Sequence, residues 1–220
     1  MKLSEAVRGV SGTLAADGEF SCIAFATEQE QSQFLTFLEK EKFLPALDNS
    51  KISCVLTTSA LAEKIPPHIK GVFLCDRPKA ALFEIHNRLA RHPDYVGASA
   101  ATVVGEGCSI SPLAAIDREN VVIGDRVTIE PFVVIKGRVI IGNDVTIRSG
   151  AVIGCKGFSF SKDTQGQNVS VEDTARIIIE DHVEIFEQVA ISTGIFPWEE
   201  TRIGENTKVD AQCFIAHGSH

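Results

Sequence analysis

From Val104 onward, hydrophobic positions recur with a period of six residues. In the central repeats a small or β-branched residue follows each aliphatic one four places later, as Val127 follows Ile123. The aliphatic positions are Val104, Ile110, Ile116, Ile123, Ile129, Ile135, Ile141, Ile147 and Ile153, and then Ile179, Ile185, Ile191, Ile203, Val209 and Ile215. This period matches neither an α-helix nor a simple strand alternation. It predicts a parallel β-helix of triangular section, three hexads to a coil, and hexads of this type are typical of left-handed winding.

Two segments interrupt the hexads. Residues 154–176 are polar and rich in turn-forming residues, so we expect them to leave the prism as a loop. Residues 192–202 lose the pattern at a Pro-Trp pair, although the step from Ile191 to Ile203 has the length of two hexads. Because loops that interrupt a rigid repeat tend to line its binding face, we expect these segments near a functional site.

Residues 1–95 follow a different pattern, which predicts a small α/β domain ahead of a β-helix domain at 96–220. We expect buried strands at 21–27, 51–57 and 71–76, and amphipathic helices at 30–44 and 78–91. The segment contains neither of the common glycine-rich phosphate loops, so no nucleotide site follows from a glycine motif.

Composition narrows the classes of function. The net charge of −8 argues against a nucleic-acid partner, because such a partner requires clustered Lys and Arg. The sequence shows no signal-peptide core and no transmembrane segment, so we expect a cytoplasmic protein. The six cysteines are scattered without a C-x-x-C pair, which predicts neither a disulfide framework nor a metal site.

His217 is the most suggestive polar residue of the prism. It occupies the third position of its hexad, where side chains point outward, and imidazole can accept a proton near neutral pH. Asp210 lies seven residues earlier, where a carboxylate near the shared corner could orient the ring. If 192–202 keeps the hexad register, Glu199 or Trp198 would lie one coil below His217; the alternative is a solvated loop. Spacing alone leaves open that His217 and Asp210 are ordinary surface residues.

Several segments resemble the UDP-3-O-(3-hydroxyacyl)glucosamine N-acyltransferases of lipid A synthesis. They are GCKGFSFSKDTQG at 154–166, RIIIEDHVEIFEQVAIS at 176–192 and TRIGENTKVDAQCFIAHG at 201–218, with weaker similarity upstream in VRGV, IAF and GVFLCDRPKAALFEI. The resemblance therefore covers nearly the whole chain. It implies that His217 is the general base and Asp210 its acidic partner. It also implies that Gly154, Gly157 and Phe158 form a substrate-contacting glycine–aromatic loop.

The resemblance also implies a reaction and its partners. Such enzymes move a 3-hydroxyacyl group from an acyl carrier protein thioester, or an acyl-CoA, to the amine of a UDP-amino sugar. They need no tightly bound cofactor and no metal, and they are homotrimers with active sites between neighbouring prisms. Uridine would stack on Phe25 in the first domain.

The sequence departs from the family pattern at several positions. The uridine motif Phe-x-x-Asn-x-x-Tyr keeps Phe25 but has Glu28 and Gln31 at the other two places. Lys156 replaces an acidic residue of the loop, and Ser-Thr-Gly at 192–194 replaces Asp-Arg-Gly. Family members continue for several more coils, so we expect this chain to be a fragment or a shortened relative. These changes favour a different nucleotide sugar or acyl donor.

Two other functions remain open. An acetyl-CoA-dependent nucleotide-sugar or O-antigen acetyltransferase would use the same prism, but the Glu-His-Asp context and the glycine-rich first turn of the related amino-sugar enzymes are missing. A non-catalytic hexapeptide-repeat scaffold would keep the prism and lose the chemistry, as the altered uridine positions suggest.

Overall fold

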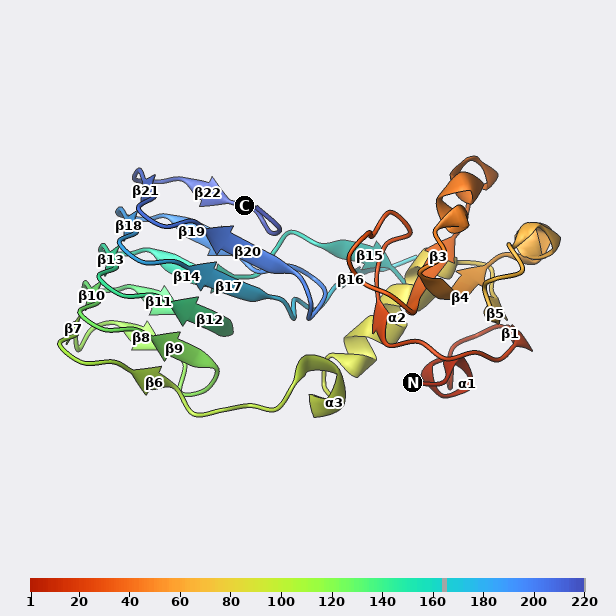
Figure 1. The fold of residues 1–220 in the computed structure, drawn as a ribbon, viewed down its shortest axis with the longest axis horizontal. Helices are drawn as coiled ribbons and strands as arrows, with labels where there is room; N and C mark the ends of the chain where they lie inside the picture. The colour runs from red at the N-terminus through yellow and green to blue at the C-terminus, as the bar shows by residue number, and fades with distance from the viewer. Residues whose placement is uncertain (164–165, 220) are drawn as a thin grey trace. The chain divides into compact units, whose positions relative to one another are not determined.

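The computed structural model describes residues 1–163 and 166–219 (Figure 1). The chain divides into two units, which we treat separately. The N-terminal unit contains Met1–Tyr95 together with Ser159–Glu172, and the prism unit contains Val96–Phe158 and Asp173–His220. Part of the segment that interrupts the hexads therefore belongs to the N-terminal unit; its residues 164–165 and the terminal His220 lie outside the described residues.

The N-terminal unit is built on a five-stranded sheet with strand order β1-β5-β4-β3-β2. The strands are β1 (Thr13–Ala16), β2 (Cys22–Ile23), β3 (Phe34–Leu38), β4 (Ile52–Thr57) and β5 (Gly71–Leu74). All neighbours pair in parallel except β1, which runs antiparallel to β5 at the edge. The helices are α1 (Leu3–Ala6), α2 (Pro78–Leu89) and the 3₁₀ helices η1 (Glu41–Asp48) and η2 (Ser59–Lys64), while α3 (Pro93–Val96) lies at the boundary of the units.

The strands expected at 51–57 and 71–76 and the helix expected at 78–91 are confirmed as β4, β5 and α2. The helix predicted over 30–44 was wrong, because its first half forms β3 and its end forms η1. β3 lies inside the sheet, and Phe34, Leu35 and Leu38 are all buried. A strand covered on both faces reads as a continuous apolar run, which spacing alone does not distinguish from a helix.

Three parallel sheets of five strands form the prism unit and confirm a parallel β-helix architecture. The first face contains β6 (Val103–Val104), β9 (Val121–Ile123), β12 (Arg138–Ile141), β17 (Arg176–Ile179) and β20 (Glu200–Ile203). The second face contains β7 (Ser109–Ile110), β10 (Thr128–Ile129), β13 (Thr146–Ile147), β18 (Glu184–Ile185) and β21 (Lys208–Val209). The third face contains β8 (Ala115–Ile116), β11 (Val134–Ile135), β14 (Val152–Cys155), β19 (Ala190–Ser192) and β22 (Phe214–Ile215).

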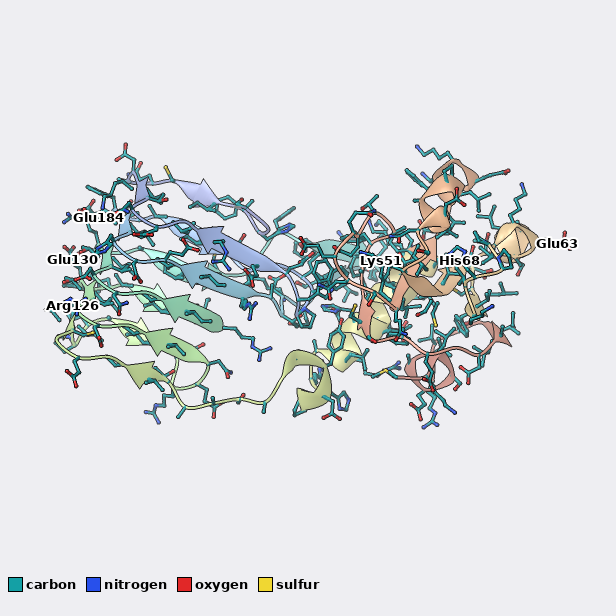
Figure 2. The ribbon with its side chains drawn as sticks, in the orientation of Figure 1. Lys51, Glu63, His68, Arg126, Glu130 and Glu184 are labelled. Carbon is teal, nitrogen blue, oxygen red and sulfur yellow. The ribbon has the colours of Figure 1, made fainter. Side chains whose placement is uncertain are left out.

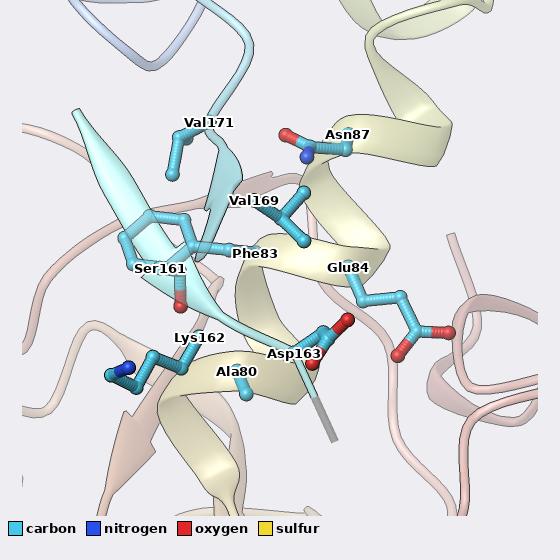
Figure 3. A pocket seen from close by; sticks show the side chains of 9 residues that line it. All are labelled: Ala80, Phe83, Glu84, Asn87, Ser161, Lys162, Asp163, Val169 and Val171. Atoms are coloured by element: carbon cyan, nitrogen blue, oxygen red, sulfur yellow. The ribbon is translucent and has the colours of Figure 1, made fainter. Parts of the chain in front are cut away.

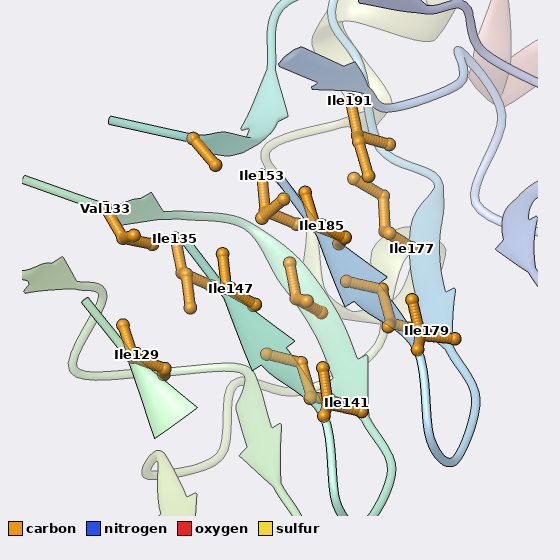
Figure 4. Packing of buried hydrophobic residues seen from close by; sticks show 14 of the residues in the cluster. Ile129, Val133, Ile135, Ile141, Ile147, Ile153, Ile177, Ile179, Ile185 and Ile191 are labelled. Carbon is orange, nitrogen blue, oxygen red and sulfur yellow. The ribbon is translucent and has the colours of Figure 1, made fainter. Parts of the chain in front are cut away.

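The hexad positions form the core of this prism, as predicted. Ile141 pairs with Ile123 on one side and Ile179 on the other, so the aliphatic residues stack in columns (Figure 4). Within the central coils these side chains are almost completely buried, and the small residues that follow, such as Val145 and Ala151, are buried beside them. Burial of apolar surface therefore fixes which hexad residue faces inward on each face.

The corner between the first and second faces is held by a ladder of side chains. The Asp181 carboxylate accepts the backbone N–H of Asn143 at 2.7 Å, and the Asn143 side-chain oxygen accepts that of Asp125 at 2.9 Å. Asp125 in turn accepts the N–H of Glu106 at 2.8 Å. Each rung ties one coil to the next, so the length of this turn is tightly constrained.

The corner between the third face and the next first face is different, and we call it the insertion corner. Three steps across it exceed six residues: Ile116 to Ile123, Ile153 to Ile179 and Ile191 to Ile203. The interpretation of the last step as two hexads was wrong, because Ile203 pairs with Ile179 on the first face and the whole segment makes one step. Within the described prism strands, every departure from the hexad spacing lies at this corner.

Candidate active site

His217 lies at the insertion corner, two residues after β22, and its side chain is exposed. The adjacent Gly218 has φ +68° and donates its N–H to the Thr201 hydroxyl at 3.1 Å. Thr201 is fully buried and donates that hydroxyl to the carbonyl of Ser192 at 3.0 Å. The backbone beside His217 is thus fixed to the prism while the imidazole faces solvent.

Asp210 lies one corner earlier, directly after β21, and it is also exposed. Its carboxylate accepts the N–H of Ala211 at 2.8 Å. The chain between Asp210 and His217 crosses the whole third face through β22. Within the described part of a single chain, no hydrogen bond joins the two residues.

The coil below His217 does not contain Glu199 at the equivalent position. β22 pairs with β19 so that Ile215 lies opposite Ile191, which places residues 192–194 at the level of His217. The Glu199 carboxylate instead accepts the N–H groups of Ile195 at 2.8 Å and Phe196 at 3.1 Å. Of the two alternatives for this segment, the placement of Glu199 one coil below the histidine is therefore excluded, because the insertion shifts the register.

The glycine–aromatic loop leaves the prism at the same corner; its first glycine, Gly154, lies in β14 and the other residues follow that strand. Gly154 has φ +87°, and a side chain on it would meet the carbonyl oxygen of Lys136 at 1.9 Å, so only glycine fits. Gly157 donates its N–H to the Asp173 carboxylate at 2.7 Å, and Phe158 is 94% exposed. β14 lies two strands from β22 in the third face, so the base of this loop and His217 are separated by about 10 Å along the prism.

Phe25 lies in the N-terminal unit, 37% exposed, with its ring edge-on to Phe37 at 6.5 Å and to Phe83 at 6.4 Å. It lines an aromatic pocket of about 320 Å³. The lining residues are Phe25, Ala26, Thr27, Phe37, Leu38, Glu39, Lys40, Phe43, Ala46 and Lys79. Phe43, on η1 and 55% exposed, was missed in the sequence because it lies outside the family motif.

Glu28 and Gln31, which replace the other residues of that motif, do not line the aromatic pocket. The Glu28 carboxylate accepts the backbone N–H groups of Glu30 at 2.5 Å and Gln31 at 3.1 Å. These positions therefore stabilise a turn.

The hairpin formed by β15 (Phe160–Lys162) and β16 (Asn168–Ser170) packs against α2 in the N-terminal unit. A pocket of about 280 Å³ lies between the two elements (Figure 3). Asn87 of α2 donates to the carbonyl of Ser170 at 2.9 Å and accepts the N–H of Glu172 at 2.8 Å. These bonds attach the returning strand of the hairpin to the helix.

His86 makes a second attachment from the same helix and is fully buried. Its Nε2 lies 2.8 Å from the Glu172 carbonyl oxygen and its Nδ1 lies 3.0 Å from the Tyr95 hydroxyl. A carbonyl only accepts, so Nε2 carries the proton, and in the neutral ring Nδ1 accepts from the tyrosine. Burial lowers the pKa of His86, which keeps the ring neutral in the folded chain.

His86 makes the stability of the N-terminal unit depend on pH. As the pH falls below about 6.5, the unfolded chain gains a proton that the folded chain does not take up, so the free energy of unfolding decreases. This one group contributes a slope of at most about 1.4 kcal/mol per pH unit. Chemical denaturation between pH 7.5 and 5.5 should show a smaller pH dependence in His86→Gln than in the parent chain. An equal change in the exposed-site control His182→Gln would contradict this assignment.

Among the described residues, no group of three His, Cys, Asp or Glu side chains is arranged to hold a metal ion. None of the described helices combines the length and the apolar character required to cross a membrane.

Comparison with known proteins shows the family to which the chain belongs. The family model described as bacterial transferase hexapeptide (six repeats) matches residues 120–155. A UDP-3-O-acylglucosamine N-acyltransferase of Coxiella burnetii is 29% identical over 98% of this chain and 69% of its own length. Proteins of the same name from Bradyrhizobium and Helicobacter hepaticus are 37% identical (87% of this chain, 61% of the relative) and 30% identical (94% and 67%). The chain belongs to the UDP-3-O-acylglucosamine N-acyltransferase family of hexapeptide-repeat acyltransferases.

Proposed function

We propose that this protein is a cytoplasmic N-acyltransferase that moves a 3-hydroxyacyl group from acyl carrier protein to the amine of a UDP-amino sugar, as in lipid A biosynthesis. The observation that carries the proposal is the position of His217. It lies at the insertion corner, from which the loop of Gly154, Gly157 and Phe158 also departs. The left-handed winding that the hexads predict is part of this proposal.

His217 would act as the general base. Its imidazole removes a proton as the amine nitrogen attacks the thioester carbonyl carbon and forms the C–N bond. The tetrahedral intermediate then collapses, the C–S bond breaks, and the thiolate takes the proton from the imidazolium. Backbone N–H groups would stabilise the oxyanion, and the transfer requires no tightly bound cofactor.

Asp210 would be the acidic partner that orients the imidazole. Because one chain holds Asp210 and His217 at successive corners, we propose that the pair forms between neighbouring copies in a homotrimer. Mixed trimers of Asp210→Ala and His217→Ala chains would then regain activity at the boundary that contains both intact side chains.

The outward residues of the prism support association through two of its faces. The first face presents Val103, Val122, Ile140 and Ile178 on its first four strands and Arg202 on its last, and the third face presents Ala115, Val134, Val152, Ala190 and Phe214. Val122 is 46% exposed and Phe214 is 63% exposed. Apolar columns on both sides of the insertion corner form a surface that a second copy would cover.

The second face is polar by contrast. Its outward column is Ser109, Thr128, Thr146, Glu184 and Lys208. Arg148 links Glu130 at 3.5 Å with Glu184 at 3.3 Å across coils, and Figure 2 shows Glu130 and Glu184 along one side of the prism. We expect this face to remain in solvent.

A charged side chain introduced into one of the outward apolar columns should dissociate the proposed trimer. Val122→Lys would bury an ammonium group in the interface, which is costly without a partner, so the chain should sediment as a monomer at micromolar concentration. Thr128→Lys, at an outward position of the second face, should sediment as the parent chain does. Trimers formed equally by both variants would contradict the assignment of the interface.

Replacement of Phe25 should weaken the binding of the UDP-sugar without a comparable effect on the chemical step. Stacking of a base on an aromatic ring contributes about 1–3 kcal/mol, so Phe25→Ala should raise the KM for the UDP-sugar at least fivefold with little change in kcat. Steady-state kinetics at saturating acyl donor measures this. Phe132→Ala removes a ring that is 65% exposed on the prism and serves as the control. Equal effects of both variants would argue against stacking at Phe25.

The central test is a donor panel with a UDP-acylglucosamine acceptor. We expect turnover with 3-hydroxyacyl thioesters of acyl carrier protein and none with acetyl-CoA. Turnover with acetyl-CoA alone would instead identify an acetyltransferase. A trimer without turnover on any donor, and without a thermal shift from UDP-sugars, would identify a scaffold.

A further inference from the structure

A cationic pocket borders the aromatic pocket in the N-terminal unit. It has a volume of about 340 Å³ and lies where the start of α2 meets the hairpin β15–β16. Its lining residues are Glu39, Arg77, Lys79, Ala80, Phe160, Ser161, Lys162 and Asn168. Glu39 and Lys79 line both pockets, so the two pockets adjoin each other, and we refer to them together as the groove.

The charge of this pocket is opposite to that of the chain. Three cationic side chains, Arg77, Lys79 and Lys162, line it, whereas the protein carries a net charge of −8. The one carboxylate, Glu39, accepts the backbone N–H of Lys79 at 3.1 Å. A local positive excess in an acidic protein attracts an anion to this position.

Neutral groups hold these cations in place. Arg77 donates to the carbonyl oxygen of Asp163, and Lys162 donates to that of Gly166 at 3.1 Å. The Lys79 ammonium lies 5.9 Å from the centre of the Phe83 ring. Among the described residues, no salt bridge to a carboxylate involves Arg77, Lys79 or Lys162. Figure 3 shows the Lys162 ammonium directed away from the carboxylates of Glu84 and Asp163.

The form of the groove indicates which anion it takes. One end offers aromatic rings for a flat base, and the next pocket along offers a guanidinium and two ammonium groups, which bind phosphate oxygens. We infer that Arg77, Lys79 and Lys162 bind the diphosphate of a nucleotide whose base occupies the aromatic pocket. This inference rests on the proposed function, which supplies a UDP-sugar as substrate. The inference also assigns a function to the hairpin, because β15 contributes Lys162 to the diphosphate site.

The test compares the binding of uridine, UMP and UDP by titration with the chain of 220 residues. We expect affinity to rise with each phosphate and the gain from uridine to UDP to decrease as salt concentration rises. Arg77→Ala and Lys162→Ala, neither of which lines the aromatic pocket, should each weaken the binding of UDP at least fivefold and leave the binding of uridine unchanged. Arg77→Lys should retain part of the affinity for UDP. Lys70→Ala, whose ammonium contacts the Pro67 carbonyl at 3.0 Å outside the groove, is the matched control.

The possible outcomes separate this inference from the function on which it rests. Equal affinities for uridine and UDP, or variants that bind UDP like the parent chain, would overturn the diphosphate site even if acyl transfer proceeds. Loss of acyl carrier protein binding in the same variants, with UDP binding intact, would assign the cations to an acidic protein and would also overturn it. Tighter binding of UDP than of uridine, abolished by Arg77→Ala, would support the site even if no acyl transfer is found.

Discussion

Replacement of His217 with alanine should lower kcat for acyl transfer by about 100- to 10,000-fold, the usual contribution of a positioned general base. The KM for the UDP-sugar should change little, because the proposed nucleotide groove lies in the N-terminal unit. His217 is exposed, so the variant should unfold at the same denaturant concentration as the parent chain. Steady-state release of the carrier thiol, combined with a chemical denaturation curve, separates chemistry from stability.

His182 provides a control within the same repeat. It lies at another corner of the prism, its side chain is 50% exposed, and its Nδ1 is 3.9 Å from the Asp144 carboxylate. His182→Ala should therefore retain the kcat of the parent chain. A kcat close to that of the parent chain in His217→Ala would contradict the assignment of His217 as the general base.

Replacement of Gly154 with alanine should have the second large effect, on folding and activity together. Gly154 lies in β14 of the third face and Gly137 lies two residues after β11 of the same face, and their positive φ angles are similar, +87° and +82°. A side chain on Gly137 meets no atom within 4 Å, whereas one on Gly154 meets the Lys136 carbonyl oxygen at 1.9 Å. Gly137→Ala should therefore cost only the left-handed backbone penalty of about 1–2 kcal/mol.

Gly154→Ala adds a clash between adjacent coils to the same penalty. Because the coils are close-packed, the backbone can move little to relieve the clash. We therefore expect a total loss of about 3 kcal/mol or more in the free energy of unfolding. The folded fraction should also have reduced activity, because the loop of Gly157 and Phe158 would leave the prism in a different direction. Equal free energies of unfolding for Gly137→Ala and Gly154→Ala would show that the clash with the Lys136 carbonyl does not affect stability.

The prism could be predicted from the sequence because its period is a local property. Each coil repeats the same burial, so Ile141 and Ile179 reveal their shared face before any contact is known. Segment lengths mislead where an insertion happens to match the period, as between Ile191 and Ile203. β3 was missed for a related reason, since an apolar run covered on both faces carries no period.

Only some residues of the candidate sites could be proposed from the sequence. His217 and Gly154 belong to short motifs, and a short motif can be recognised in a single sequence without the structure. The groove of the N-terminal unit is assembled from η1, α2 and the hairpin, so Phe43, Lys79 and Lys162 come together only through tertiary packing. No spacing rule connects residues so far apart in the chain.

The two kinds of corner give the prism different capacities for evolutionary change. Where Asp125, Asn143 and Asp181 tie consecutive coils together, a longer turn would break the ladder, so that edge resists insertion. The insertion corner already holds segments of very different length, while the aliphatic core residues of the strands on either side, such as Ile153 and Ile191, stay opposite one another. A loop at the insertion corner can thus be exchanged to change substrate preference without a change in the edge that the Asp125–Asn143–Asp181 ladder holds at fixed length.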